Sequence, residues 1–432
     1  MHRCRLPNWP AIVQRAAHFA ALLLLLGGAS GCASFHRRPI QYHLEPKYTV
    51  ADPQFLRSME YLMGPSIRPE NQVTALVNGD QIFPAMLAAV RGAQKTITLE
   101  TYIYWSGDIG KEFTDALCER AHAGVKVHVL VDWIGSRKFD SKLLKQMRAA
   151  GVEVHKHNPF HWLNPIQFNY RDHRKLLIVD GRVGFTGGVG IADIWRGNAD
   201  APDHWRDSMF KLEGPAVGQM QGAFMDNWMK TSGRVLDGPD YFPELSPAGH
   251  QYAQVFFSSP KDGVESVRLM YLLSFAAAQK SIRLSASYFV PGKLTTRELV
   301  DAAKRGVKVE IILPGAETDS PIVRHASRSK WGPLLEAGVK IYEYQPTMYH
   351  CKMMIVDEVW VSVGSANFDN RSFRLNDEAN LNIYAPDFAA EQVKVFEADK
   401  AKSDEMTYEE WKNRPICKRI LEFFISPFRP QF

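Results

Sequence analysis

The 432-residue chain has little cysteine and no apolar run long enough to cross a membrane comfortably. Its five cysteines are irregularly spaced, which excludes a disulfide framework and a cysteine-based metal site. The apolar run at residues 19–26 falls well short of the ~20 residues that a membrane-spanning helix needs. No group of histidines, cysteines and carboxylates has metal-ligand spacing, so we expect neither a metal nor another cofactor.

A strong charge of either sign is also missing. The formal net charge is +5 and the isoelectric point is near 8.8, which permits attraction to anionic lipid or nucleic acid without choosing between them. Apolar residues make up 45% and charged residues 23% of the chain, as in globular proteins. The length allows two to three average domains, or one large core built from two halves.

One stretch, residues 170–188, is the most informative part of the chain. It reads YRDHRKLLIVDGRVGFTGG and predicts a buried strand over 176–179, closed by the hairpin signal Asp180-Gly181. Because side chains alternate along a strand, His173 and Lys175 point to the same side. An imidazole beside an ammonium group suits attack on a phosphorus atom with neutralisation of its oxygens.

The same stretch occurs again at residues 349–367, which read YHCKMMIVDEVWVSVGSAN. The second copy repeats three side chains at the same spacing: His350, Lys352 and Asp357 correspond to His173, Lys175 and Asp180. Gly364-Ser365 then falls where Gly187-Gly188 does, seven residues after the aspartate. A single such pattern is weak evidence, since lone histidines are usually ordinary core or surface groups, but a duplicated pattern favours function.

Strands and helices are predicted to alternate on both sides of this repeat, which indicates an α/β sandwich. Three further pairs of segments match at offsets of 182 to 187 residues, against 177 for the two histidines: 93–95 with 278–280, 124–127 with 306–309, and 150–152 with 337–339. This indicates an internal duplication with a linker near 231–254. We therefore expect two pseudo-symmetric halves, 73–230 and 255–400, packed face to face so that both histidine–lysine pairs share one cleft.

The two ends of the chain carry targeting signals. Arginines, the apolar run 19–26 and small residues before Cys32 form a leader over 1–32 of the bacterial lipoprotein type, with Cys32 lipidated; an uncleaved signal anchor is the alternative. Residues 33–72 are predicted to be a tether. Residues 401–432 mix aromatic and basic side chains and fit either a membrane-associating segment or a helix docked on the core. A second lipid-facing loop is expected around Trp162.

The doubled H-x-K-x4-D pattern resembles the phospholipase D superfamily and, within it, the bacterial cardiolipin synthases. The likeness spans residues 73–383 and is carried also by the segments 78–80, 99–103, 185–188 and 376–380. The two N-terminal transmembrane helices of longer synthases have no counterpart, so the short type with a soluble core is the nearer match. The resemblance implies two phospholipase D-like αβα sandwich halves with one shared active site.

The resemblance also implies roles for supporting residues. Asn367 matches a position whose amide helps to hold the phosphate, and Gly190 stands in the first copy where the family usually has asparagine. Asp207 and Glu378 match acidic positions that orient the catalytic histidines, and Ser365 is expected to be a further donor. Asp180 and Asp357 complete the catalytic motif but are expected to tie the hairpins rather than transfer protons.

The expected reaction is two successive displacements at phosphorus. Neutral His173 attacks and forms a phosphohistidine, His350 moves the protons, and Lys175 and Lys352 offset the anionic charge. The leading hypothesis is phosphatidyl transfer between two phosphatidylglycerol molecules, giving cardiolipin and glycerol at a membrane surface, in an exported protein anchored through its N-terminus. The alternatives are a hydrolytic phospholipase D, a nuclease-like phosphodiesterase and a non-catalytic lipid-binding protein. We expect no nucleic acid partner, and the oligomeric state stays open.

Overall fold

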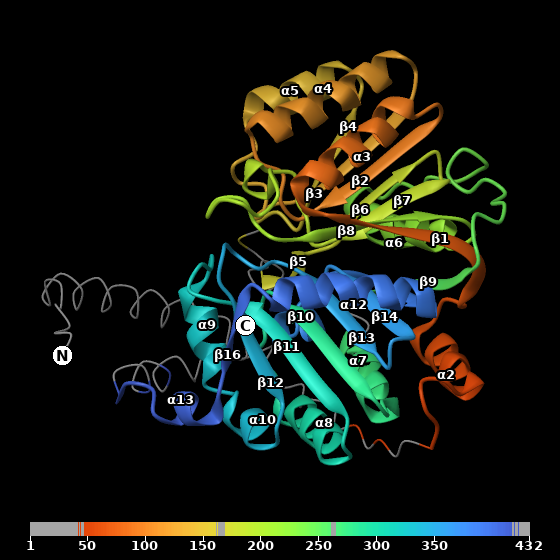
Figure 1. Cartoon of the computed structure of the whole chain (residues 1–432). Helices are drawn as coiled ribbons and strands as arrows, with labels where there is room; N and C mark the ends of the chain where they lie inside the picture. Colours follow the sequence, from red (N-terminus) through yellow and green to blue (C-terminus); the bar gives the residue numbers. More distant parts are fainter. Residues whose placement is uncertain are drawn as a thin grey trace, which may run out of the picture.

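The computed structural model describes residues 47–160, 169–260 and 265–416, together with the single positions 42, 44, 162, 419 and 422. Within these residues one continuous sheet runs through the molecule in the order β16-β12-β11-β10-β13-β14-β15-β9-β1-β8-β7-β6-β2-β3-β4, with the short β5 pairing β15 off this path. The order is nearly the same read from the centre in either direction, so the sheet consists of two equivalent halves that meet at β1 and β9 (Figure 1).

The strands of the first half are β1 (Arg68–Val77), β2 (Thr96–Thr101), β3 (Lys126–Asp132), β4 (Glu153–His157), β5 (Arg171–Asp172), β6 (Lys175–Val179), β7 (Val183–Gly187) and β8 (Ser208–Glu213). Those of the second half are β9 (Gln251–Ser258), β10 (Ser281–Ala286), β11 (Lys308–Pro314), β12 (Lys340–Tyr344), β13 (Lys352–Val356), β14 (Trp360–Gly364), β15 (Asn376–Tyr384) and β16 (Ser403–Met406). In each half three strands are parallel and the hairpin strands beside them are antiparallel.

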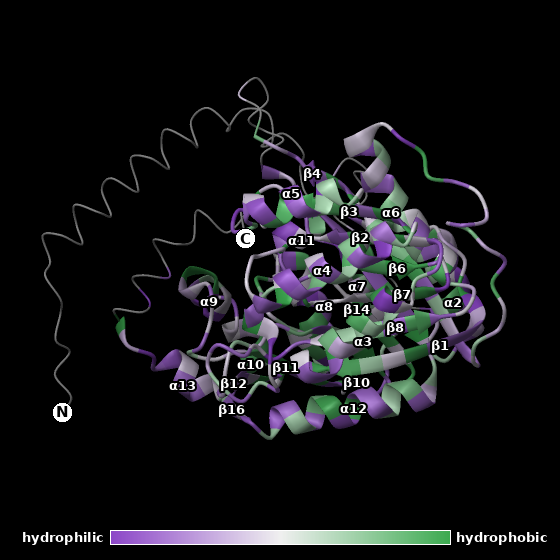
Figure 2. Ribbon diagram, turned by 90° about the horizontal axis from the view of Figure 1, so that it is seen from above, coloured by the Kyte–Doolittle hydropathy of each residue, from purple (hydrophilic) through white to green (hydrophobic). Residues whose placement is uncertain are grey.

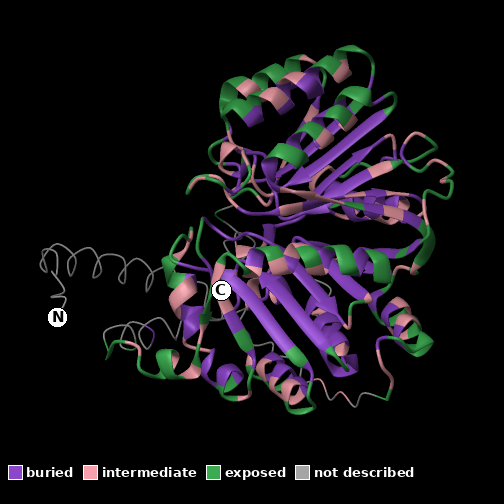
Figure 3. Ribbon diagram, in the orientation of Figure 1, coloured by how far each residue is buried: buried purple, intermediate pink, exposed green. Residues whose placement is uncertain are grey.

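Helices cover both faces of the sheet. The first half carries α3 (Asn78–Gly92), α4 (Asp108–His122), α5 (Ser141–Ala149), a short 3-10 turn at Asp193–Trp195 and α6 (Val217–Ser232). The second half carries α7 (Ser266–Ala277), α8 (Lys293–Lys304), α9 (Pro321–Arg328), α10 (Gly332–Glu336), α11 (Asn370–Arg374), α12 (Pro386–Lys400) and α13 (Tyr408–Lys412). Buried residues line the strands and exposed ones the outer faces of the helices (Figure 3).

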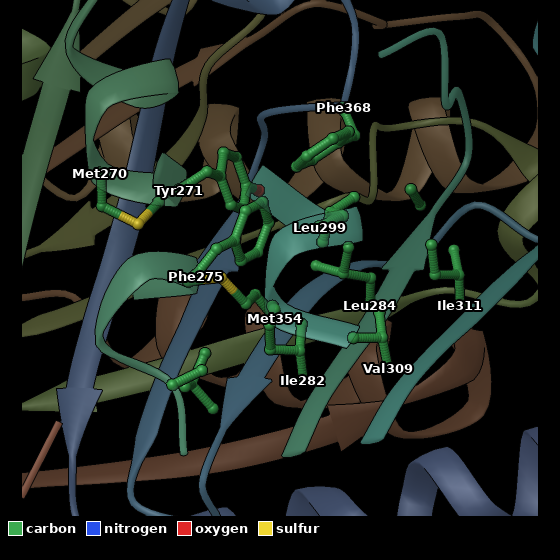
Figure 4. Packing of buried hydrophobic residues seen from close by; sticks show 14 of the residues in the cluster. Met270, Tyr271, Phe275, Ile282, Leu284, Leu299, Val309, Ile311, Met354 and Phe368 are labelled. Atoms are coloured by element: carbon green, nitrogen blue, oxygen red, sulfur yellow. The ribbon is translucent and has the colours of Figure 1, made fainter. Parts of the chain in front are cut away.

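Three large hydrophobic clusters fill the layers. One lies under α3 and α4 and a second under α7 and α8, where Phe275, Leu284 and Leu299 pack together (Figure 4). The third lies between the halves and joins α6 to α12, with Phe224 and Phe388 both fully buried. Hydrophobic colour is concentrated in central strands such as β6 and β7, while α12 shows both characters along its length (Figure 2). The halves therefore share one continuous core.

The two predicted hairpins are present, and an aspartate ties each of them. Asp180 turns the chain from β6 to β7 at φ +53°, followed by Gly181 at φ +62°. The Asp180 carboxylate accepts main-chain N–H bonds from Gln94, Lys95 and Thr96 at 2.7–2.9 Å. It therefore anchors the hairpin to the start of β2.

Asp357 repeats this arrangement between β13 and β14. Its carboxylate accepts from the N–H groups of Gln279, Lys280 and Ser281 at 2.7–2.9 Å. Lys175 and Lys352 begin strands β6 and β13, so both carboxylates form their hydrogen bonds at the opposite ends of these strands. These contacts are the ones expected of aspartates that tie the hairpins, and whether Asp180 and Asp357 take part in the reaction stays a prediction.

The expectation of a tether over 33–72 is wrong for its second part. Helix α2 (Pro53–Met63) is capped by the Asp52 side chain and buries Phe55 and Met59 completely in the second-half core. Strand β1 begins at Arg68 and occupies the centre of the sheet. The polar composition of this stretch conceals the strand, because pairing on both edges rather than apolar alternation holds it.

The first part of the C-terminal segment docks on the core. Strand β16 pairs with β12, and the Trp411 indole donates to the main-chain oxygen of Arg328 at 2.6 Å while its ring packs over Gly332. The rest of the predicted amphipathic tail falls largely outside the described residues, as do Cys32 and the leader. Among the described helices none is both long and apolar enough to cross a bilayer.

Candidate active site

The two histidines are held at the junction of the halves, each by a strand of the opposite half. The His173 N–H donates to the main-chain oxygen of Asp377 at 2.9 Å, where β5 pairs with β15. The His350 N–H donates to the main-chain oxygen of Arg206 at 2.8 Å, beside a bridge between Arg206 and Tyr349. Both histidine–lysine pairs therefore come together along this junction, although 177 residues separate the histidines.

The carboxylates beside the histidines also cross from one half to the other. Nδ1 of His173 lies 3.0 Å from Oε2 of Glu378, and Nδ1 of His350 lies 2.6 Å from Oδ2 of Asp207. All four side chains are buried. With Nδ1–H donating to the carboxylate, Nε2 of each ring carries the lone pair. Neither half thus holds the acid that orients its own histidine.

Each lysine bonds to the main chain of the histidine two residues before it, and Lys352 also contacts the imidazole ring. Lys175 Nζ donates to the main-chain oxygen of His173 at 2.6 Å. Lys352 Nζ makes the equivalent bond to His350 at 2.6 Å, donates to Ser287 Oγ at 2.7 Å, and lies 3.1 and 3.2 Å from the two ring nitrogens of His350. Both side chains are at most 5% exposed.

Burial and mutual repulsion oppose positive charge on this cluster. Burial lowers the pKa of Lys175 to about 7, with Lys352 adding to the effect and Glu378 opposing it. Burial also lowers the pKa of His173 to about 4, and burial together with Lys352 lowers the pKa of His350 to about 3. Glu378 shows the converse: burial works to raise its pKa, but His173 and Lys175 hold it at about 2.

Such a cluster is suited to an anion. A phosphate group beside the rings would favour their charged forms, because an opposite charge within ~4–6 Å raises the pKa of a base. Two imidazoles with unprotonated Nε2 atoms and two lysine amines offer a nucleophile, a proton carrier and charge neutralisation in one place.

The surroundings of the two carboxylates differ. Glu378 accepts from Ser365 Oγ at 2.6 Å, from Ser372 Oγ at 2.7 Å and from Asn376 Nδ2 at 3.2 Å. Ser365 thus contacts the carboxylate instead of standing alone as a phosphate donor. Its counterpart is Gly188, where a Cβ would lie 2.2 Å from the carboxylate of Asp207.

Asp207 has a different set of donors. Its Oδ1 accepts from the main-chain N–H of Ser208 at 2.8 Å, and its Oδ2 accepts from the indole Nε1–H of Trp195 at 3.1 Å in addition to His350. Both donors besides His350 are fixed N–H groups, whereas two of the donors to Glu378 are hydroxyls that can rotate.

The second half has an asparagine, Asn367, at the position predicted to contact the phosphate, and the first half has Gly190 there. Asn367 is 3% exposed, and its side-chain oxygen has no hydrogen-bond partner among the described residues. At Gly190, the corresponding position, a Cβ would lie 2.9 Å from Ile103 Cβ and 3.1 Å from the ring of Trp195. Ile103 and Trp195 together occupy the space that an asparagine side chain would need.

Sequence reasoning missed the aromatic walls of the site. The Tyr102 ring lies 5.2 Å from the His173 ring and 5.5 Å from the ammonium of Lys175. Trp195 and Trp205 lie 5.5 and 5.4 Å from the His350 ring. None of these positions belongs to the repeated motif, so no spacing signal marks them. Among the described residues no group of metal-binding side chains forms a site.

The family model described as "Cardiolipin synthase, PLD-like domain" matches residues 86–198 and 272–400 of the chain. The chain is 37% identical to cardiolipin synthase 1 of Bacillus cereus over 366 residues, covering 82% of this chain and 71% of that protein. It is 36% identical to the major cardiolipin synthase of Bacillus subtilis over 357 residues, covering 82% and 74%.

The fold has a solved counterpart. The crystal structure of phosphatidylserine synthase from Haemophilus influenzae superimposes with a TM-score of 0.65 at 15% identity, covering 88% of this chain and all of that one. This confirms the predicted α/β fold. With the family match and the identities above, the chain belongs to the cardiolipin synthase family of phospholipase D-like proteins.

Proposed function

We propose that the protein is a cardiolipin synthase that transfers a phosphatidyl group from one phosphatidylglycerol to another, releasing glycerol. The observation that carries this proposal is the crossed pair of dyads, His173–Glu378 and His350–Asp207, with a lysine beside each ring. Two imidazoles of matched geometry fit a reaction in which one phosphodiester replaces another. Such an exchange needs no external energy source.

In the first displacement, Nε2 of His173 attacks the phosphorus of a phosphatidylglycerol. The bond between phosphorus and the glycerol headgroup oxygen breaks, a phosphorus–nitrogen bond forms, and His350 gives its proton to the departing oxygen. Glu378 keeps the proton of His173 on Nδ1 and stabilises the ring as it gains positive charge. Lys175 and Lys352 offset the charge on the phosphoryl oxygens.

In the second displacement, a headgroup hydroxyl of another phosphatidylglycerol attacks the same phosphorus. His350, now neutral, accepts the proton of that hydroxyl, and the phosphorus–nitrogen bond breaks. The products are cardiolipin and the original neutral His173. The cycle balances, because the proton given to glycerol is recovered from the acceptor.

The first step requires a protonated His350, although burial and Lys352 lower the pKa of that ring to about 3. The bound phosphodiester supplies the compensation, since its negative charge favours the imidazolium. Proton uptake therefore accompanies binding of the anionic lipid. This coupling restricts the acid form of His350 to the complex in which it is used.

A membrane surface is the proposed location. Large apolar side chains are exposed after strand β4, where Phe160 is 53% and Trp162 76% exposed, and on helix α9, where Ile322 is 48% exposed. A tryptophan, which has an apolar ring and a polar N–H, favours the bilayer interface. An exported protein held by a lipid on Cys32, or by an uncleaved signal anchor, would keep this surface beside its substrate.

The decisive experiment is product analysis with phosphatidylglycerol vesicles as the only lipid. Cardiolipin and glycerol in equal amounts are expected from the wild type, and His173→Ala should abolish both. Phosphatidic acid as the only lipid product would instead identify a hydrolytic phospholipase D. Full lipid turnover by His173→Ala and His350→Ala would refute the assigned chemistry.

A further inference from the structure

Tyr288 and Asp319 form a polar pair on the second-half side of the site that the displacement chemistry does not use. The Tyr288 hydroxyl donates to Asp319 Oδ2 at 2.5 Å. Tyr288 follows β10 and precedes a bridge to Phe368, while Asp319 lies in the loop between β11 and α9. The tyrosine is half-buried and the aspartate is exposed, so the pair faces accessible space.

Main-chain and side-chain contacts place this pair next to the reacting groups. Ser287, the residue before Tyr288, accepts a hydrogen bond from the ammonium of Lys352. The main-chain oxygen of Tyr288 accepts the N–H of Phe368, the residue after Asn367. Burial lowers the pKa of Lys352, and the carboxylate of Asp319 opposes that effect. Burial raises the pKa of Tyr102, and Asp319 adds to that effect. Tyr102 itself contacts His173.

A carboxylate here is costly for a site that binds anionic lipid, because it repels the phosphate. Its presence is explained if it accepts hydrogen bonds from the substrate. A vicinal diol can donate two hydrogen bonds to one carboxylate, and a phenol oxygen beside it can accept or donate a third. The free glycerol of a phosphatidylglycerol headgroup carries such a diol.

We propose that Tyr288 and Asp319 form the subsite that binds the hydroxyls of the glycerol headgroup. This inference deepens the proposed function and rests on it. The glycerol that leaves in the first displacement and the headgroup that enters in the second occupy the same side of phosphorus, opposite His173. One subsite therefore serves both: it holds the two free hydroxyls of the leaving glycerol and the one acceptor hydroxyl that does not attack. Holding the acceptor headgroup in place also gives it an advantage over water in the second step.

The test compares the ratio of cardiolipin to phosphatidic acid formed from phosphatidylglycerol vesicles. Asp319→Asn and Tyr288→Phe should each lower this ratio at least fivefold, because water gains on a poorly held acceptor, and should raise the KM for phosphatidylglycerol. Glu317→Gln is the matched control, since Glu317 is an exposed carboxylate in the same loop, and should keep the wild-type ratio.

The outcomes separate the subsite from the function. An unchanged ratio in both Asp319→Asn and Tyr288→Phe overturns the subsite, as does an equal fall in Glu317→Gln. A wild type that forms no cardiolipin overturns the proposed function itself. Because the ratio is measured within each reaction, a variant with less folded protein still gives a valid reading.

A second, independent observation concerns Trp195. Its Nε1–H donates to Asp207 at 3.1 Å, its ring lies 5.5 Å from the His350 ring, and it fills the space beside Gly190. In the second half Ser372, 177 residues later, donates to Glu378 in the same way. We infer that Trp195 is a positioning residue that fixes the Asp207–His350 dyad by donating to Oδ2, the carboxylate oxygen that His350 also contacts.

Trp195→Phe keeps the ring and removes the N–H. With one donor gone, Asp207 interacts more strongly with His350, so the basic limb of kcat/KM, on which His350 loses its proton, should move to higher pH while kcat falls. Trp205→Phe is the matched control: its ring is equally close to His350, at 5.4 Å, but its indole N–H makes no hydrogen bond to any described residue. Its basic limb should match the wild type. Identical pH profiles for the two variants overturn the assignment.

Discussion

Replacing Glu378 by glutamine tests the crossed arrangement of the site most directly. Glu378 is fully buried and receives His173 Nδ1 at 3.0 Å, Ser365 Oγ at 2.6 Å and Ser372 Oγ at 2.7 Å. Glutamine has nearly the same shape, removes the negative charge and replaces one acceptor oxygen by an N–H₂ donor. The first-half histidine should therefore lose its electrostatic partner although no residue of its own half has changed.

The magnitude follows from the bond that is weakened. A hydrogen bond to a charged group contributes about 1.5–3 kcal/mol, and each 1.36 kcal/mol is about a factor of ten in rate. As His173 gains positive charge during attack, Glu378→Gln should lower kcat by about 10- to 150-fold. The fold should tolerate the change, because Ser365 can turn its hydroxyl toward the main-chain oxygen of Ala379, 3.3 Å away.

The assay is cardiolipin formation at saturating phosphatidylglycerol, together with the unfolding midpoint of each variant. Asp207→Asn is the informative comparison. Its new amide N–H₂ must face either the Ser208 N–H or the fixed N–H of Trp195, so it should lose stability as well as activity. A Glu378→Gln variant with wild-type kcat would refute the role assigned to this carboxylate.

Three further predictions follow from the charges. Binding of dimethyl phosphate, a diester anion that does not titrate near neutral pH, should take up about one proton at pH 7, measured by calorimetry in buffers of different ionisation enthalpy; no uptake would contradict the coupling to His350. Burial holds the pKa values of His173 and His350 at about 4 and 3, below the unfolded value of ~6.5. The free energy of unfolding should therefore fall as pH drops below 6.5, by up to about 1.4 kcal/mol per pH unit for each histidine. It is measured by urea unfolding at each pH, and a His173→Asn/His350→Asn variant whose free energy of unfolding falls equally steeply would contradict this. Asp180→Ala should cost about 1–3 kcal/mol of stability without lowering kcat of the folded enzyme, and loss of kcat at full stability would return Asp180 to the reaction.

Much of the fold was predictable because local signals and the duplication agree. The strand at β6 and its hairpin follow from an apolar run and Asp180-Gly181. Strand β1 escaped prediction because its place in the sheet is set by its neighbours β8 and β9. Helix α2 was missed for a different reason: Phe55, Met59 and Met63 mark its buried face at helical spacing, and the prediction of a tether passed over this signal.

The residues of the site were likewise predictable where a repeat or a resemblance marked them, and not where only the fold brings them together. The motif residues could be found because they repeat, and the supporting acids because they resemble family positions. Their pairing could not: nothing local to Glu378 indicates that it contacts His173, since the bond spans 205 residues. The positioning role of Trp195 could not be predicted either, because no repeated or spaced motif includes this residue, and the space beside Gly190 that it helps to fill is visible only in the fold.

The crossed contacts explain why a duplicated protein keeps both copies in one core. The first half provides His173, Lys175 and Asp207, and the second provides His350, Lys352 and Glu378, but each half holds the acid that the other half's histidine needs. The Arg206 guanidinium reinforces the junction through two 2.8 Å bonds to the buried carboxylate of Asp399 in the second half. A shift of one half against the other would therefore disconnect both dyads together. The joined sheet at β1 and β9 and the shared core between α6 and α12 hold the rings in register, so rigidity of this junction is itself a requirement of the two-step exchange.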